Sequence, residues 1–364
     1  MSLAKVTWQG VWTMAQHEAR LRLRSGRWRL LLGLWFVVVT GFTLLVQQAV
    51  RRTYSTSDDR GIVVYGVLVL FVLGLALLVV PSLTGQSVNG DRERGTLATL
   101  QVTLLSAPEI ALGKLLAAWG TSLVFVLLTV PAMLLTMTQG GVPLGRLAVV
   151  GLVLVLLLGV VAALALCLSA LLSRTTTSGV LSYLVVFALC LGTLISFGLA
   201  LQLTNERYQE TFTNECPPRE LLVRDGVPPE EIERILATCG STETYDSTRS
   251  REDKVWWLLA PNPFVILADA APQLPPLSAA EQRRREQLQQ QGVYVQDLRD
   301  ADPLGGIGRE VRGLRSGPGD ERPGGPVWPY GLAFDVLLAV GAVWLTARRL
   351  RAPSRVLPRG QRVA

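Results

Sequence analysis

Residues 91–114 read DRERGTLATLQVTLLSAPEIALGK and lie between two strongly apolar runs. Residues 62–85 before them and residues 115–137 after them consist almost entirely of apolar side chains and glycine. Apolar runs of this length, with so few charges, are long enough to cross a bilayer as helices. The stretch is therefore predicted to form a polar elbow, residues 86–109, between two membrane spans.

The elbow carries two signals for the start of a helix. Asp91 is a candidate N-cap of a short helix, and Glu93 would lie in its first turn at the positive end of the helix dipole. Ser106, Pro108 and Glu109 give the second signal, as N-cap, first-turn proline and reciprocal capping partner. An ordinary capped loop and a docking surface both fit this local pattern.

The composition indicates a membrane protein. The chain has 364 residues, of which 49% are hydrophobic and 17% charged, and its mean hydropathy is positive. A single histidine argues against a histidine-based metal site or acid–base site. The formal net charge is +7, but the basic residues cluster beside apolar runs. This pattern favours contact with anionic lipid headgroups over binding of nucleic acid.

The predicted topology has six transmembrane helices, with both chain ends in the cytoplasm. Residues 1–29 are expected to form an amphipathic helix in the headgroup plane, because Trp8 and Trp12 share one face. Arginines cluster before the first apolar run and after the last, which indicates cytoplasmic ends. The predicted parts are the interfacial helix 1–29, spans one to five in 30–203, an external segment 204–326, span six in 327–347, and a basic cytoplasmic tail 348–364.

The external segment, residues 204–326, has more acidic than basic residues, as expected for a translocated region. Short helices are predicted over residues 228–236 and 278–291. Residues 255–271 are apolar but interrupted by two prolines, so they are too broken to span a bilayer. Two alternatives stay open for them: a segment that dips into the outer leaflet, or the core of a small external domain.

The four cysteines fall into two groups. Cys167 and Cys190 lie inside apolar runs and are expected to be small buried side chains. Cys216 and Cys239 lie in the segment predicted to be external, where an oxidising environment favours a disulfide. Sequence spacing does not prove pairing, so free thiols stay open as the alternative.

Recognisable catalytic motifs are absent from the sequence. It contains no phosphate-binding loop of the form G-x-x-x-x-G-K-[ST] and no nucleophile elbow or H-E-x-x-H pair. The predicted spans are nearly free of ionisable residues, with Asp335 in the sixth as the main exception. An acid at this depth is a candidate functional residue, and a polar partner to a neighbouring helix or to headgroups is the alternative.

The elbow resembles a signature of type-2 ATP-binding-cassette (ABC) transporter permeases. That signature reads E-x-G-T-L, then P, then G-K, and the matching residues here are Glu93, Gly95, Thr96, Leu97, Pro108, Glu109, Gly113 and Lys114. The serine- and threonine-rich turn at residues 169–177 and the six predicted spans agree with the resemblance. The similarity covers most of residues 1–203 and the last span, while the external segment is longer than is usual in the family.

The resemblance implies a coupling helix at residues 91–100 that docks on an ATPase. Its residues would be Asp91, Arg92, Glu93, Arg94, Gly95, Thr96, Leu97 and Leu100, with Glu93, Arg94 and Thr96 facing the ATPase. It also implies a dimer with a second permease, either another copy or a homologue. The ATPase, with its ATP and magnesium, would be a separate polypeptide, so this chain is expected to bind no cofactor and to be no enzyme.

The function predicted from the sequence is that of the permease subunit of an ABC exporter in the plasma membrane. The alternative is an ATPase-coupled membrane sensor or scaffold, in which the external segment binds a ligand or partner without transport. A membrane-embedded enzyme fits least well, because no catalytic constellation is present. The sequence does not indicate the substrate.

Overall fold

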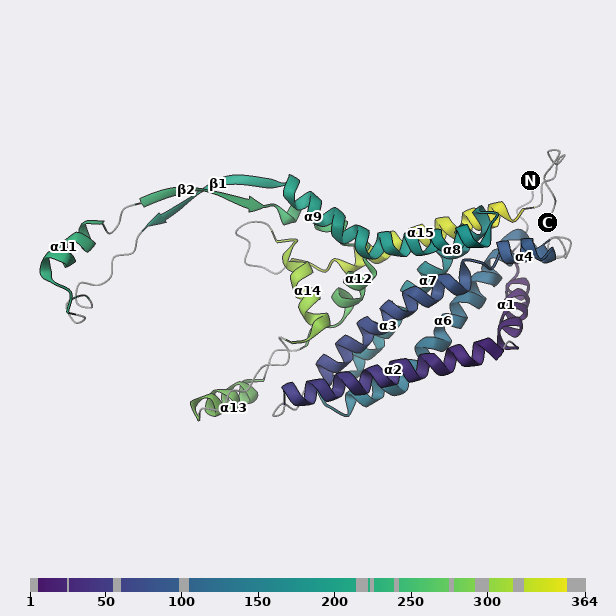
Figure 1. Ribbon diagram of the computed structural model, residues 1–364, viewed down its shortest axis with the longest axis horizontal. Coiled ribbons are helices and arrows are strands. Elements are labelled where there is room, and N and C mark those ends of the chain that lie inside the picture. Colours follow the sequence, from purple (N-terminus) through teal and green to yellow (C-terminus); the bar gives the residue numbers. More distant parts are fainter. Residues whose placement is uncertain are drawn as a thin grey trace.

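The computed structural model describes residues 6–24, 26–54, 60–97, 105–213, 222, 226–238, 242–274, 278–291, 301–316 and 324–351. Its long helices lie side by side in one bundle (Figure 1). The bundle contains α1 (Trp8–Leu23), α2 (Gly26–Thr53), α3 (Arg60–Thr84), α4 (Asn89–Glu93), α6 (Ala107–Met137), α7 (Leu144–Leu171), α8 (Thr175–Phe187), η1 (Ala188–Gly192), α9 (Thr193–Leu203) and α15 (Trp328–Arg349). Between α9 and α15 lie β1 (Asn205–Thr213), α11 (Pro229–Thr238), β2 (Thr242–Ser250), η2 (Glu252–Lys254), η3 (Trp256–Leu258), α12 (Pro263–Ala270), α13 (Ala279–Gln290) and α14 (Pro303–Gly313).

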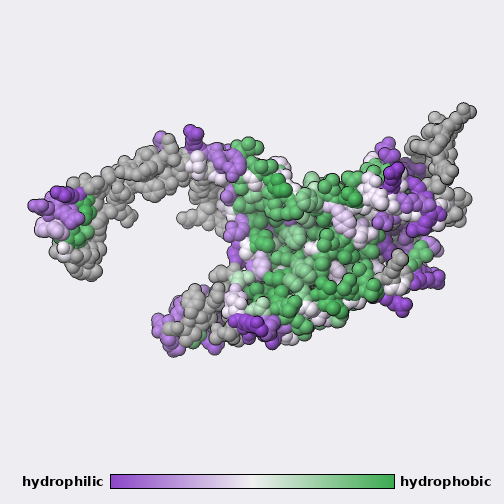
Figure 2. All heavy atoms as spheres, in the orientation of Figure 1, coloured by the Kyte–Doolittle hydropathy of each residue, from purple (hydrophilic) through white to green (hydrophobic). Residues whose placement is uncertain are grey.

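Six of the described helical segments are long and apolar enough to cross a membrane. Hydrophobic residues cover the side of the bundle, and hydrophilic residues gather at its two ends (Figure 2). The predicted class, an α-helical multi-pass membrane protein, is therefore confirmed. The six segments are Trp28–Thr53, Arg60–Glu93, Ala107–Met137, Leu144–Leu171, Thr175–Leu203 and Trp328–Arg349.

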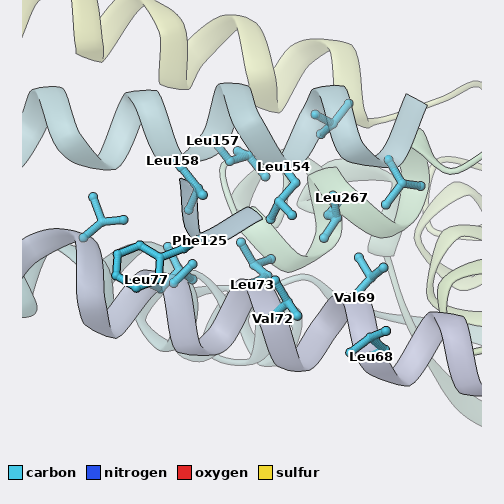
Figure 3. Packing of buried hydrophobic residues seen from close by; sticks show 14 of the residues in the cluster. Leu68, Val69, Val72, Leu73, Leu77, Phe125, Leu154, Leu157, Leu158 and Leu267 are labelled. Atoms are coloured by element: carbon cyan, nitrogen blue, oxygen red, sulfur yellow. The ribbon is translucent and has the colours of Figure 1, made fainter. Parts of the chain in front are cut away.

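The helix α3 lies at the centre of the bundle, where it packs against α2, α6 and α7. Leu73 and Leu77 of α3 meet Phe125 of α6 and Leu158 of α7 in the main core (Figure 3). Lipid tails are as apolar as these side chains, so close van der Waals packing holds the helices together in a bilayer. Many α3 side chains are buried by these helices, and others, such as the 57% exposed Leu78, are apolar on the outer face of a membrane span.

The helix α12 (Pro263–Ala270) lies inside the bundle, against α7, α15 and η1. Leu267 belongs to the same core cluster as the central residues of α3 and is 0% exposed (Figure 3). Because α12 packs with residues of the spans, it is not the core of a separate external domain, and its position is compatible with the alternative of a segment that dips into the membrane. Within the described part of the segment after span five, α12 thus packs together with the membrane-spanning helices.

An ion pair fastens the segment after α12 to the spans. Arg146, in the first turn of α7, donates to Asp302, which is the N-cap residue of α14. Asp302 precedes Pro303, and a Cβ placed on Gly66 of α3 would come within 2.7 Å of the Pro303 ring. The start of α14 thus lies tightly against both α3 and α7.

Asp269 makes a second buried link, to the start of span six. Its carboxylate accepts hydrogen bonds from the backbone N–H groups of Val327, at 2.6 Å, and Trp328, at 2.8 Å. Arg312 of α14 donates to the same carboxylate, and the Asp269 side chain is 0% exposed. A carboxylate at a helix N-terminus satisfies free N–H groups and favours the helix dipole, so Asp269 joins α12, α14 and α15.

Span five changes its helical pitch at η1, a π-helical turn. The Asn262 side-chain amide donates to the Cys190 carbonyl at 2.7 Å and to the Thr193 hydroxyl at 2.9 Å. A π-helical turn shifts the backbone hydrogen bonds by one residue, and such turns are frequent at functional sites. The residue before α12 therefore contacts span five at its irregular turn.

An antiparallel hairpin, β1 and β2, continues from α9 and extends away from the bundle, with α11 toward its far end (Figure 1). Its register pairs Asn205 with Ser250. At this base, hydrogen bonds from Lys254 and Arg251 hold the pKa of Glu206 below its ordinary value. The sequence analysis did not predict this hairpin, because its strands are polar and their pairing is not local.

Candidate functional site

The elbow follows α3 as a turn over residues 85–88 and then as the short helix α4 (Asn89–Glu93). The N-cap position is Val88, and no side chain caps the helix. The expected capping role of Asp91 is therefore wrong, because Asp91 lies inside α4. Gly90 also belongs to α4.

Gly95, with a φ of 72°, lies between α4 and a further helical stretch at residues 96–97. This left-handed conformation is one that glycine adopts at little cost and other residues avoid. Residues 98–104 of the elbow lie outside the described residues, and Leu100 of the predicted coupling helix is among them. Over the part that the structure describes, α4 is shorter than predicted and begins earlier.

Lys114 of α6 connects the elbow to two other helices. Its ammonium group donates to the carboxylates of Glu18 in α1 and Asp91 in α4, and to the Ser87 carbonyl at 3.2 Å. The Lys114 side chain is only 1% exposed, so its charge depends on these partners. The lysine of the G-K motif therefore bridges span three, the elbow and the amphipathic helix.

Glu93 connects the elbow to span five. Its carboxylate accepts from the Thr175 backbone N–H at 3.1 Å and from the Thr175 hydroxyl at 3.3 Å. Thr175 is the first residue of α8, where backbone N–H groups have no helical partner. The glutamate of the E-x-G-T-L motif thus caps the helix of another span.

The turn between α7 and α8 binds α4 through further residues. Arg92 donates to the Leu172 carbonyl at 3.2 Å, and Asn89 donates to the Arg174 carbonyl at 3.2 Å. Ser169, near the end of α7, accepts from the Val88 N–H at 3.0 Å. The serine-rich turn that supported the resemblance is therefore a direct partner of the elbow.

Glu109 joins the starts of α6 and α1. Its carboxylate accepts from the backbone N–H of Ser106 at 2.7 Å and from the backbone N–H of Thr7 at 2.8 Å. The Ser106 hydroxyl also donates to Glu109, and Ser106 at the N-cap and Glu109 at N3 form the predicted capping box. Pro108 lies in the first turn of α6, at a position where its missing N–H costs no helical bond.

Gly113 allows α1 to approach α6 closely. A Cβ at this position would lie 2.5 Å from the Met14 Cβ and 2.9 Å from the Val11 carbonyl oxygen. Any side chain at residue 113 would therefore displace α1. The G-K motif thus combines a close helix contact with the ion pairs of Lys114.

A small apolar cluster lies beneath the elbow. Leu97, the last residue of the E-x-G-T-L motif, is 2% exposed and packs in this cluster. The cluster draws on α1, α6, α7 and α15, and its buried members are Met14, Val88, Leu97, Ile110, Ala111, Leu166, Ala170, Ala347 and Leu350. The burial of Leu97 in this cluster therefore attaches the elbow to the helix bundle.

Residues 93–96, which we call the exposed strip, form the solvent-facing part of the described elbow. Arg94 pairs with Asp91 at 2.9 Å, and its side chain is 68% exposed. The Thr96 hydroxyl donates to the Asp91 carbonyl at 3.2 Å. Of the residues predicted to face an ATPase, all three lie in this strip.

A polar cavity of about 380 Å³ opens beside α4, between α1 and α3. Glu18, Arg22, Asp91 and Arg94 line it with both signs of charge. Burial lowers the pKa of Arg22 below its ordinary value, and the nearby Glu18 carboxylate opposes this shift. The elbow therefore has polar surroundings on its inner side as well as on its exposed side.

Asp335 lies away from the elbow, within α15. Gly331, one turn earlier, touches the residues before α12, since a Cβ there would overlap the Ala260 carbonyl. The Asp335 side chain is 1% exposed, and its carboxylate oxygens have no hydrogen-bond partner among the residues described. The described helices thus supply no hydrogen bond for it, and a functional role stays a prediction.

The predicted disulfide falls on Cys216 and Cys239, which lie outside the described residues, so it stays a prediction. Cys167 and Cys190 are free thiols, the first buried and the second partly buried. Sequence reasoning missed other polar partners within or near the spans, notably Ser169 of α7. The sequence did contain a signal for this contact: Ser169 lies in an otherwise apolar helix end. A buried hydroxyl group is usually hydrogen-bonded, so a polar partner could have been expected.

The comparison with known families agrees with the motif. Residues 43–211 match the family model described as ABC-2 family transporter protein. The matched region runs from within α2 to β1 and contains the whole elbow with its partners in α6, α7 and α8. This match confirms, over residues 43–211, the predicted resemblance to type-2 ABC transporter permeases. A search of curated proteins gave no match.

Proposed function

We propose that the chain is the permease subunit of an ABC exporter and is driven by a separate ATPase bound at the exposed strip. One observation carries this proposal: α4 bonds to α6 through Lys114, to α8 through Glu93 and to the end of α7 through Ser169. A displacement of α4 would therefore act on three spans together. The elbow is thus connected to enough spans to transmit a movement of the ATPase to the membrane region.

The proposed mechanism is a shift between two arrangements of the spans. Closure of the ATPase on ATP would move the exposed strip, and the bonded helix ends would follow. Because packed interfaces tend to have discrete arrangements, a small displacement at the elbow can change the populations of inward-open and outward-open states. ATP and magnesium would belong to the ATPase, and the chain itself would catalyse no reaction.

The remaining parts of the proposal concern orientation and assembly. The end of the bundle that carries α1 and α4 would face the cytoplasm, and the β1–β2 hairpin would face the outside of the cell. Two permeases, identical or homologous, would pair in the plasma membrane with two ATPases. The arginine clusters near both chain ends support this orientation.

Site-specific cross-linking tests the contact. A photoreactive amino acid at position 94 should cross-link, in the native host, to a protein whose sequence contains a phosphate-binding loop. The same group at position 344, an exposed tryptophan site on α15, is the matched control and should not. Equal capture from both positions, or none from position 94, would contradict the docking surface.

Mutation of the strip tests coupling in the purified complex. Glu93→Ala removes the cap of α8 and should lower ATP hydrolysis in proteoliposomes while the complex still assembles. Glu230→Ala, at an exposed site in α11, removes the same charge elsewhere and should leave hydrolysis unchanged. Normal hydrolysis and transport in Glu93→Ala would show that Glu93 does not transmit the motion.

The second candidate function is an ATPase-coupled sensor or scaffold. The observation that favours it is the β1–β2 hairpin, which extends from the bundle and offers surface to a partner (Figure 1). Replacing residues 207–248 by a short turn separates the two functions. A transporter should retain ATP-driven transport after this change, whereas a sensor should lose its response and keep its ATPase contact.

A further inference from the structure

A groove of about 570 Å³ runs between α6, α7 and α15, at a distance from the exposed strip. On α15 its lining residues recur at helical spacing from Val336 through Val340 and Trp344 to Arg351 just beyond the helix. Fifteen steps at 1.5 Å per residue give a length of about 22 Å. The groove therefore follows span six from its middle to its basic end, comparable to the depth of one leaflet.

Small residues make the groove deep. Gly159 and Ala163 of α7 and Ala339 of α15 line it where larger side chains would fill it. Trp119 of α6 forms one wall, and its indole N–H donates to the Val155 carbonyl at 2.8 Å. A Cβ on Gly159 would lie 3.1 Å from the indole nitrogen, so the absence of a side chain there preserves the wall.

The lining suits a hydrocarbon chain. Apart from Arg351 and the indole N–H groups of Trp119 and Trp344, its side chains are apolar. Val340 is 62% exposed and Trp344 is 61% exposed, so the groove is open to its surroundings along a membrane span. A polar ligand would lose its hydrogen bonds to water here, whereas an acyl chain would lose nothing.

The basic end of the groove suits an anionic headgroup. Arg351 lines this end, and the Arg348 guanidinium lies 5.5 Å from the centroid of the Trp344 ring. Arg348, Arg349 and Arg351 form no ion pair with any residue in the described ranges. Guanidinium groups bind phosphate strongly, and basic residues next to a span attract anionic lipids.

We propose that this groove binds one acyl chain of an anionic phospholipid from the bilayer, and that Arg348 and Arg351 hold its phosphate. Pro108 and Leu112 of α6 line the same groove, within two turns of Lys114. A bound lipid would therefore brace α6 against α15 close to the helix that holds the elbow. The inference does not depend on an ATPase or on transport.

Native mass spectrometry of the purified full-length chain tests the lipid site. The probes are dioleoylphosphatidylglycerol, which is anionic, and dioleoylphosphatidylcholine, which is zwitterionic. Ala339→Trp fills the groove, and Leu337→Trp is its control on a 71% exposed lipid-facing site of the same helix. The double variant Arg348→Gln/Arg351→Gln removes charge at the groove, and Arg51→Gln/Arg52→Gln removes the same charge at the end of α2.

We expect one phosphatidylglycerol molecule per chain, retained at least tenfold better than phosphatidylcholine. Ala339→Trp should reduce this retention about tenfold, and Arg348→Gln/Arg351→Gln should abolish the preference between the two lipids, while both controls behave as the unmodified chain. Equal retention of the two lipids, or a preference that survives the loss of both arginines, would overturn the proposal. Conversion of a dimer to a monomer by Ala339→Trp would also overturn it, since a second copy would then occupy the groove. The arginine variant keeps the test valid if Ala339→Trp fails to fold.

Discussion

Arg146 and Asp302 lie 156 positions apart in the chain, yet their side chains form an ion pair at 2.5 Å in which each is 1% exposed. Removing one partner of a buried pair leaves an uncompensated charge. We expect Arg146→Met alone to lower the free energy of unfolding by about 3–5 kcal/mol. Thermal unfolding in detergent measures the loss.

The matched double variant separates the pair from its surroundings. Arg146→Met/Asp302→Leu removes both charges and should recover most of the stability, because two apolar side chains need no partner. A double variant as unstable as the single one would show that Asp302 or Arg146 has another essential role. Limited proteolysis around residue 301 reports whether α14 has left the bundle.

Lys114 and Arg94 both pair with Asp91, but from different environments. Lys114→Met should lower the free energy of unfolding by about 3–5 kcal/mol, because Asp91 and Glu18 would lose a buried cation. Arg94→Met should cost at most about 1 kcal/mol, because that pair faces solvent. Equal melting temperatures for the two variants would contradict the assigned role of Lys114.

Two glycines of α6 provide a sharp steric comparison. Gly113→Ala places a methyl group against Met14 and should destabilise the fold by about 1–3 kcal/mol through overpacking. At Gly120 an added Cβ meets nothing within 4 Å, so Gly120→Ala should be neutral or slightly stabilising. Hydrogen exchange of α1 measures whether this helix loosens in the first variant only.

We expect the buried Asp335 side chain, which has no partner among the described residues, to make the protein less stable to unfolding than an apolar residue at the same position would. Burying an unpartnered polar group costs about 1–3 kcal/mol, so Asp335→Leu should raise the melting temperature. Asp335→Asn keeps a polar group of the same shape and should raise it less. If both variants lower the melting temperature, the carboxylate has a partner outside the described residues, such as a second permease.

The sequence predicted the spans well because long apolar runs have few alternatives to crossing a bilayer. It also identified the elbow, since Glu93, Gly95 and Lys114 stand out between such runs. It did not indicate what these residues bind. Glu18, the partner of Lys114, and Thr175, the partner of Glu93, are distant in the chain, and only the packing of the bundle brings them together.

The position of α12 was harder to predict for a different reason. Its apolar residues fit a buried helix as well as a membrane-surface helix, and periodicity does not distinguish them in eight residues. The contacts of Asp269 and Asn262 with spans six and five show that α12 packs against these spans. Both are polar residues in an apolar segment, which is the signal that sequence reasoning passed over.

The enclosed position of α12 limits how this protein can be shortened. The segment between spans five and six contains a removable appendage, the β1–β2 hairpin, and an indispensable insert, α12 with the start of α14. Deleting the whole segment would leave a cavity among the spans. It would also leave the buried Arg146 without Asp302, its ion-pair partner. A minimal permease should therefore keep residues 252–274 and 301–316, and variation in length between related chains should concentrate in the hairpin.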